Sequence, residues 1–308
     1  MAIQNTLLTY GDVSRKEDVV LNAVEILTAE ENTVMRLLGK TEAIDTVHSF
    51  LVDTLATPGT LAVAMGTDPS LTALTTPTRL SNIVQEVAYA FQVSRPQEKI
   101  QHYHGQNETE RQLSKGLMNW GNAAEYDLVR STLVSGLSGT TAKMNGVIAA
   151  ISKSTNTTAH TSGTVFSATI LDGLMQDNWT NSNGDVATDL LVGGVMRRVI
   201  DGFTQKSNIV VNNPSSAMTI VKTVSTYETA FGTLSIHKHR YVQETADATG
   251  RVLGIRPEKL KIAYLDKPMV KDLAENGAYT KKMIYGSLTL EVNNQDSNFF
   301  ASGFLKSA

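Results

Sequence analysis

The feature that most constrains this chain is a long stretch at residues 57–78, which is rich in Thr, Ala, Gly and Pro and lies between two strand-like segments. A loop longer than about 15 residues with no structure of its own is uncommon inside a compact domain. The stretch therefore favours a long hairpin that projects from its own domain and packs on another surface. An ordinary surface loop has the same composition and stays open as the alternative.

Alternating apolar residues predict strands on both sides of this stretch. Positions 87–93 place Val, Tyr, Phe and Val on one face, and residues 47–55 fit an earlier strand. Upstream, capping boxes that begin at Ser14 and Thr28 predict two short helices, the second ending at Gly39 as a left-handed cap. Residues before Asp12 lack periodicity, which indicates an extended arm.

The next segment has the pattern of a long amphipathic helix. Residues 108–135 carry apolar side chains at intervals of three or four, namely Leu113, Leu117, Trp120, Ala124 and Leu128. Such a helix would be roughly 40 Å long, and we expect it to act as a spine. Gly116 and Gly121 within it either permit close backbone approach or weaken it.

Beyond Gly136 helical and alternating patterns mix, which indicates an α+β fold. Helices are expected after Ser167 and over 196–203, and a short buried strand over 189–192. Alternation then predicts strands at 233–237, 260–264 and 288–292, with a short helix at 269–274 before the last of them.

Composition excludes several classes of function. The 308 residues include no cysteine, which excludes disulfides, thiolate metal sites and thiol nucleophiles. Lys and Arg number 27 against 30 Asp and Glu, and the net charge of −3 provides no overall basic field for nucleic acid. No stretch is apolar enough to predict a membrane span, and the first residues do not resemble a secretory signal.

Two His-x-His pairs are the strongest candidates for metal ligands. His102 with His104, and His237 with His239, would each place two rings on one face of a strand. Neither pair has a third ligand or an acidic partner patterned with it. We therefore expect solvated or interface histidines, with no metal and no cofactor.

Other reactive patterns are incomplete. Residues 153–155 lack the glycines of a phosphate loop, and Gly193 with Gly194 lacks the third glycine of a dinucleotide fingerprint, so a close turn is expected there. The cations Arg197, Arg198 and Lys206 are expected to face solvent or a neighbouring subunit. No catalytic residue is predicted, and the chain is not expected to be an enzyme.

The order of elements is an arm, a Thr- and Ala-rich hairpin, a spine helix, an α/β domain and a return into long strands. This order resembles the major capsid protein of tailed double-stranded DNA phages, in the fold type named for phage Hong Kong ninety-seven. The resemblance is sharpest in three runs near the C-terminus, at residues 260–266, 271–277 and 281–292. Residues 189–194 and 226–234 add to it, so the similarity extends over nearly the whole chain.

The resemblance implies five parts of an α+β capsid fold. They are an N-terminal arm with short helices (1–45), an extended β-hairpin loop (46–98), the spine helix of a peripheral domain (99–137), an axial domain (138–232) and the return strands of the peripheral domain (233–308).

The resemblance also implies a structural role in the virion. The chain would self-assemble into hexamers and pentamers that form an icosahedral head around a double-stranded DNA genome, after assembly in the cytoplasm of a bacterial host. Implied partners are further copies of the chain, a portal protein, and scaffolding and decoration proteins; DNA would be enclosed without sequence-specific binding, and no membrane is involved. An encapsulin-type nanocompartment shell is the first alternative, and a His-dependent metal hydrolase is the second.

The extended loop is expected to supply contacts between subunits. The candidate residues are its apolar side chains, Leu51, Leu55, Leu61, Val63, Met65, Leu71 and Leu74. The name-giving member of the family links subunits through a lysine of this loop, which attacks an asparagine amide on a neighbour. This chain has no lysine between Lys40 and Lys99, so no such cross-link is expected.

Overall fold

The structure, a computed structural model, describes residues 32–55, 62–68, 76–100, 107–151, 156–203, 225–243 and 247–305. The chain divides into two compact units, one with residues 1–30, 88–122 and 268–285 and the other with residues 31–87, 123–267 and 286–308. Helix α3 (Glu108–Arg130) and the strands β4 (Gln85–Ser94), β10 (Leu260–Leu273) and β11 (Tyr279–Val292) each contribute residues to both units.

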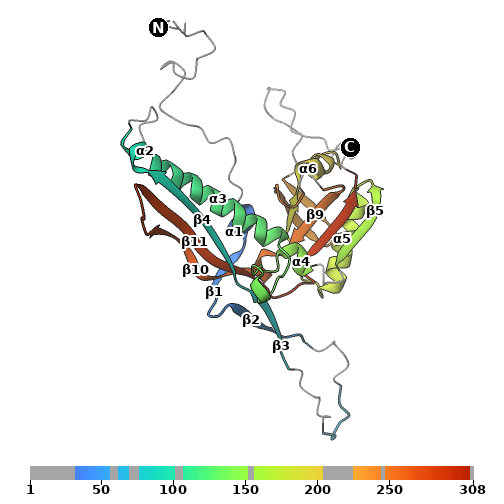
Figure 1. Cartoon of the computed structure of the whole chain (residues 1–308). Coiled ribbons are helices and arrows are strands. Elements are labelled where there is room, and N and C mark those ends of the chain that lie inside the picture. The colour runs from blue at the N-terminus through green and yellow to red at the C-terminus, as the bar shows by residue number, and fades with distance from the viewer. Residues whose placement is uncertain are drawn as a thin grey trace, which may run out of the picture. The chain divides into compact units, whose positions relative to one another are not determined.

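A four-stranded sheet has the order β1-β10-β11-β4 (Figure 1). Its short edge strand β1 (Gly39–Glu42) runs parallel to β10 and places Glu42 opposite Tyr264. The alternation predicted for 87–93 is confirmed, because Val87 and Val93 are buried and the residues between them on the other face are exposed.

Two local predictions along this sheet are wrong. Residues 269–273, expected in a short helix, continue β10 as an extended strand, because β11 lies beside it and supplies backbone partners that an isolated helical turn would lack. Gly39 does not cap a helix. Helix α1 (Thr33–Leu37) ends at an extended Leu38, and Gly39 begins β1 opposite Lys261. The earlier predicted helix and the arm lie outside the described residues.

The spine helix is confirmed as α3, although it ends at Arg130 and not at 135. Trp120, Ala124 and Leu128 are buried as predicted, whereas Leu117 is 46% exposed. At Gly116 the backbone of α3 lies close to Ile284 of β11, since an added Cβ would lie 2.7 Å from the Cδ1 atom of that residue.

A six-stranded mixed sheet forms most of the second unit, in the order β5-β12-β9-β6-β8-β7. The strands are β5 (Thr157–Thr164), β12 (Phe299–Phe304), β9 (Gly250–Ile255), β6 (Asp189–Val192), β8 (Gly232–Lys238) and β7 (Thr226–Thr229). The strands predicted at 189–192 and 233–237 are therefore confirmed. β6 is parallel to β8 and antiparallel to β9, and Leu190, Leu191 and Val192 are all fully buried.

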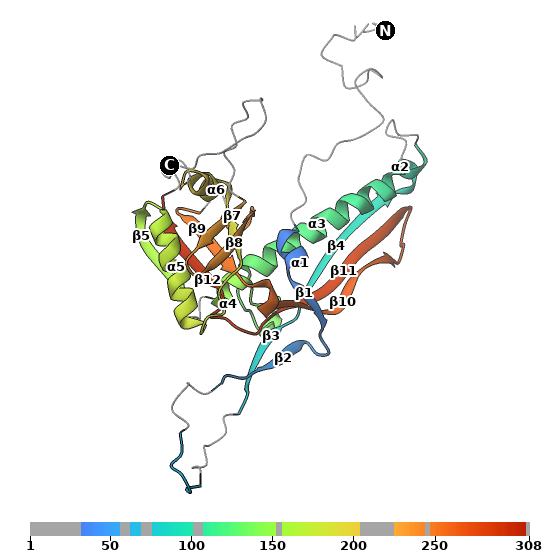
Figure 2. The ribbon, with the colours of Figure 1, turned by 180° about the vertical axis from the view of Figure 1, so that it is seen from behind.

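Two helices pack their apolar side chains into one core with this sheet (Figures 1 and 2). Helix α5 (Ala168–Asn181) begins as predicted, with the Ile170 N–H donating to the Ser167 Oγ at 3.4 Å, and α6 (Gly194–Asp201) follows Gly193. The core includes Leu171, Leu174, Met175, Leu190, Met196, Ile200, Leu234, Phe299 and Phe304.

Shorter elements complete the described chain. They are the helices α2 (Arg95–Lys99) and α4 (Val147–Ile151) and the 3-10 turns at Leu137–Gly139 and Pro257–Lys259. Within the described ranges, no helix is long and apolar enough to cross a membrane.

The predicted strand near residue 47 is β2 (Val47–Val52), which pairs antiparallel with β3 (Thr78–Ile83). The two form a separate two-stranded sheet, from Val47 opposite Ile83 to Val52 opposite Thr78 (Figure 2). The sequence between them, which predicted a projecting hairpin, is described only at 62–68 apart from the strand ends.

A glycine pair tests the packing of the second unit. In Gly254→Ala the new Cβ would lie 2.1 Å from the ring of buried Phe299, so we expect a loss of about 1–3 kcal/mol in the free energy of unfolding. In the control Gly173→Ala, in α5, the Cβ meets nothing within 4 Å, and a gain of up to about 1 kcal/mol is expected. Denaturant unfolding measures both, and equal effects would contradict the packing described.

Candidate assembly site

The β2–β3 hairpin exposes the apolar residues expected to contact other subunits. Leu51, Leu55, Val63 and Met65 are 67%, 99%, 51% and 104% exposed. Leu61, Leu71 and Leu74 lie outside the described residues. Apolar side chains grouped on one exposed element are typical of an interaction surface.

Hydrogen bonds of β3, and of Val84 directly after it, hold the base of the hairpin. Asn82 is buried, and its Nδ2 donates to the Leu290 carbonyl at 2.8 Å and to the Asn145 carbonyl at 3.1 Å. Its Oδ1 accepts from the Asn145 N–H at 2.8 Å. The Thr289 hydroxyl donates to the Ile83 carbonyl at 2.8 Å, and Val84 N–H donates to the Thr46 carbonyl at 2.8 Å. A two-stranded ribbon is marginal alone, so the contacts with Asn145 and with Thr289 and Leu290 of β11 hold its base.

A contact between ionisable side chains holds β2. The His48 Nε2 lies 3.2 Å from the Glu291 Oε2, and Lys261 Nζ lies 3.6 Å from the Oε1 of the same carboxylate. The His48 and Glu291 side chains are 12% and 10% exposed.

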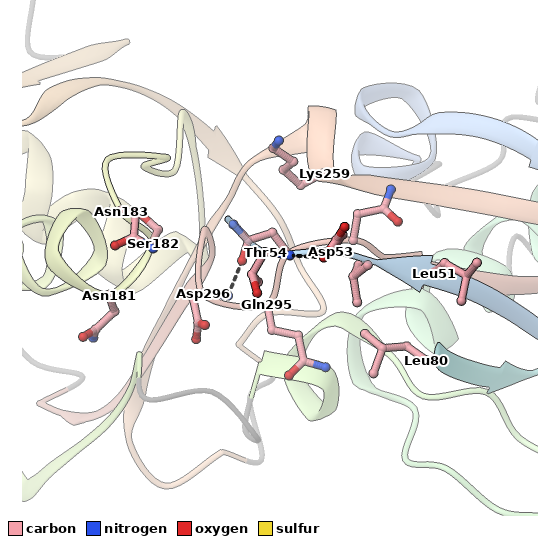
Figure 3. Close-up of a pocket in the computed structure, with 13 residues that line it drawn as sticks. Leu51, Asp53, Thr54, Leu80, Asn181, Ser182, Asn183, Lys259, Gln295 and Asp296 are labelled. Carbon is pink, nitrogen blue, oxygen red and sulfur yellow. Dashed lines mark hydrogen bonds between the residues drawn. The ribbon is translucent and has the colours of Figure 1, made fainter. Parts of the chain in front are cut away.

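A polar recess of about 510 Å³ lies beside the hairpin base (Figure 3). The residues that line it are 51–54 and Leu80 of the hairpin, 181–183, Lys259 and 293–296. Figure 3 shows Asn181, Ser182 and Asn183 on the opposite side from Leu51 and Leu80. The recess is rich in amide and carboxylate groups and contains neither a nucleophile–base pair nor a His ligand.

Buried asparagines hold the recess wall at 293–298. Asn156 and Asn178 donate from their Nδ2 atoms to the Asp296 and Asn298 carbonyls, and the Asn298 Nδ2 donates to the Asn294 carbonyl at 2.8 Å. Asn156, Asn178 and Asn298 are all at most 3% exposed. Because buried polar groups are costly unless satisfied, this network makes the loop between β11 and β12 a defined wall.

A second buried network centres on Glu125 of α3, a side chain with no exposed surface. Its Oε1 accepts from the Val34 N–H at 2.5 Å and lies 2.9 Å from the His239 Nε2, and its Oε2 accepts from the Met35 N–H at 2.9 Å. The carboxylate therefore caps the first turn of α1 from another helix.

The tautomer of His239 follows from its other nitrogen. The Tyr241 N–H donates to Nδ1 at 3.2 Å, so Nδ1 is unprotonated and Nε2 carries the proton that it donates to Glu125. Burial, and then the charge of Glu125, raises the pKa of the Tyr264 hydroxyl above its ordinary value.

The sequence-based reading of the histidines needs correction. His237 and His239 have acidic partners after all, but different ones, since the His237 Nε2 lies 2.8 Å from the Asp189 Oδ1 and His239 contacts Glu125. His102 and His104 lie outside the described residues. In the described part of the chain, no three His, Asp or Glu side chains are grouped as metal ligands.

The expectation for Arg197 also needs correction. It was expected to face solvent or a neighbour, but it is 8% exposed, with its guanidinium donating to the Ile236 carbonyl at 3.1 Å and lying 3.5 Å from Asp201. Arg198 is exposed as expected, and Lys206 lies outside the described residues.

Sequence reasoning missed Glu125, Asn82 and the asparagine network. One signal was present for Glu125, which adjoins Ala124 on the apolar stripe of a predicted helix, where a charge requires a partner. Asn82 lay between the predicted hairpin stretch and the next predicted strand, and no local pattern distinguished it from an exposed residue.

Comparison with known proteins identifies the family. Residues 3–304 match the family described as SU10 major capsid protein. The chain belongs to this family. It is therefore a capsid shell protein of the virion, and its structural relatives have the Hong Kong ninety-seven type fold that the sequence predicted. No curated protein sequence matches the chain.

Solved structures resemble the capsid chain at low sequence identity. The capsid of Myoviridae phage XM1 is 11% identical with a TM-score of 0.66, and the match covers 98% of this chain and 100% of that one. The Mycobacterium phage Che8 chain is 12% identical with a TM-score of 0.59, covering 97% and 98%. The SrpI encapsulin from Synechococcus elongatus PCC 7942 is 12% identical with a TM-score of 0.60, covering 94% of each chain.

Replacement of the buried carboxylate tests the role of Glu125. In Glu125→Gln an amide NH₂ replaces one acceptor and opposes an N–H donor, so we expect a loss of about 2–4 kcal/mol in the free energy of unfolding. Amide exchange at Val34 and Met35 should accelerate. The control Glu110→Gln, on the exposed first turn of the same helix, should be nearly neutral. Unchanged exchange at Val34 and Met35 would contradict the capping role.

Proposed function

We propose that this capsid protein assembles through its extended hairpin into hexamers and pentamers, which close an icosahedral head around the double-stranded DNA of a tailed phage. The observation that carries the proposal is the β2–β3 hairpin, whose two strands form a separate sheet and which exposes several large apolar side chains. Leu51, Leu55, Val63 and Met65 would be buried on a neighbouring copy. Each large apolar side chain contributes roughly 1.5–3 kcal/mol when fully buried.

The same proposal assigns the parts of the chain. Residues 1–45 serve as the N-terminal arm region and 46–98 as the extended loop, and 99–137 forms the peripheral domain with the long strands β10 and β11 of the 233–308 segment. Residues 138–232 form the axial domain near the centre of each capsomer, together with β8, β9 and β12, which share its six-stranded sheet. Leu61, Leu71 and Leu74 belong to the same contact surface as the described hairpin residues.

Further partners follow from the role. A portal protein would occupy one vertex, and scaffolding or decoration proteins would bind the shell, which would assemble in the bacterial cytoplasm. The net charge of −3 suits a shell whose DNA is enclosed without sequence-specific binding, because a genome driven in by a motor needs no basic lining. The role is structural and requires no catalytic residue.

An encapsulin-type shell is the second candidate, supported by the fold similarity to the SrpI encapsulin. The match to a major capsid protein family favours the phage head. The genes beside this one separate the two, since portal, terminase and head protease genes indicate a phage and a cargo enzyme gene indicates a compartment.

The hairpin variant Leu51→Ser with Leu55→Ser tests the assembly surface. Both side chains are exposed, so the fold of the subunit should be kept while the apolar contact is lost. Electron microscopy should show closed shells for the natural protein and unassembled subunits for the variant. The control, with Met at both positions, keeps the apolar surface and should still form shells. Normal shells from the Ser variant would contradict the assignment.

The second prediction concerns how the shell is held together. Because no lysine lies between Lys40 and Lys99, the extended loop cannot supply an amine for an isopeptide bond. Denaturing electrophoresis of mature particles should give one band near 33.3 kDa. A ladder of covalent oligomers that survives boiling would overturn a non-covalent shell.

A further inference from the structure

The two strands of the hairpin are attached to their unit by different chemistry. β3 is held by Asn82, whose buried amide bonds to backbone groups and does not titrate. Among the described contacts of β2 side chains, the His48–Glu291 pair is the one between ionisable groups. The hairpin therefore has one attachment through an uncharged amide and one through a pair of ionisable side chains.

We propose that His48 and Glu291 position the extended hairpin, and that protonation of His48 tightens this attachment. The inference rests on the proposed role of the hairpin in assembly, and it adds that the strength of the attachment of β2 responds to pH. His48 is a positioning residue here, because it would act on subunit contacts only through the strand that carries it.

The charges around His48 support this reading. Glu291 faces it from β11 at 3.2 Å, and Lys261 on β10 approaches the other oxygen of that carboxylate at 3.6 Å. From β3 the residue opposite His48 is Asn82, which is uncharged, and along β2 the Phe50 ring lies 6.0 Å from the imidazole. Among these neighbours, the carboxylate that faces the imidazole is that of Glu291. When His48 is neutral, Lys261 partly balances the charge of this carboxylate.

The sign of the pH effect follows from these neighbours. Histidine changes its charge between pH 5 and 8, where a carboxylate stays ionised. At the upper end, a neutral His48 keeps at most an uncharged donor toward Glu291. At the lower end, an imidazolium makes a charge-assisted bond, which is roughly twice as strong. The attachment should therefore strengthen as pH falls through this range.

Burial makes the change effective. At 12% and 10% exposure, the two side chains are screened by salt much less than a surface pair. Leu51 lies on the same strand and Leu55 just beyond its end, and both are exposed. A change in how firmly His48 holds β2 is therefore transmitted to the first apolar contacts of the hairpin.

Hydrogen exchange of the purified full chain from pH 5.5 to 8 tests the proposal, with rates normalised to the intrinsic exchange rate at each pH. Light scattering records the assembly state in every sample. Protection of β2 amides should rise by roughly threefold to tenfold toward pH 5.5, as expected for a charge-assisted contact. His48→Gln keeps a side-chain donor without a titrating group, and Glu291→Gln removes the charge. Both should flatten the profile.

The control is His237→Gln, which removes the His237–Asp189 pair of β8 and should leave the β2 profile unchanged. A flat profile in the natural protein, or an unchanged slope in His48→Gln, would overturn the proposal. The two proposals fail separately. If no shells form under the microscope but the β2 slope depends on His48, the assembly role is wrong and the positioning role stands.

Discussion

A carboxyl group with no exposed surface must be surrounded by hydrogen-bond donors, because leaving its oxygens unpaired in the interior costs several kcal/mol. Glu125 satisfies this requirement with the N–H groups of Val34 and Met35 and with the His239 ring. These donors come from the start of α1 and from the turn after β8, while Glu125 itself lies in α3. One side chain thus ties together three segments that are far apart in sequence, and β1 begins two residues after α1.

The hairpin contrasts with this buried network, because it leaves apolar side chains exposed. Polar contacts of Asn82, Thr289 and His48 hold its base, whereas Leu55 and Met65 remain exposed. A subunit with a well-packed core and an uncovered apolar ribbon is suited to association, because the free energy of burying the ribbon becomes available only when a neighbour is present. This division between a closed core and an open hairpin is what a shell protein needs.

The low identity to related capsids indicates which features preserve the fold. At 11% identity with a TM-score of 0.66, few individual side chains can be shared, so the fold must depend on pattern and topology. The alternating positions of β4, the buried strand β6 and the apolar stripe of α3 are patterns of this kind, and all three were predicted. The network around Glu125 is a specific solution within that pattern.

Errors in the sequence-based predictions share one cause. Gly39 and residues 269–273 were assigned from local signals, and both proved to be strand because a partner from elsewhere in the chain lay beside them. Arg197 is a charged residue, but its guanidinium is buried and donates to the Ile236 carbonyl. Only the tertiary structure, which brings α6 beside β8, places these two groups together. Local propensity is weak compared with backbone pairing and burial.

The sequence alone determined the α+β class, the spine helix and the absence of cysteine chemistry, because periodicity and composition report directly on which faces are buried. The tertiary structure alone decided the partners of the polar side chains. Glu125 with His239, His48 with Glu291 and His237 with Asp189 are pairs separated by 114, 243 and 48 positions. No local pattern encodes such a pair, since it forms only when folding brings distant segments within about 3 Å of each other.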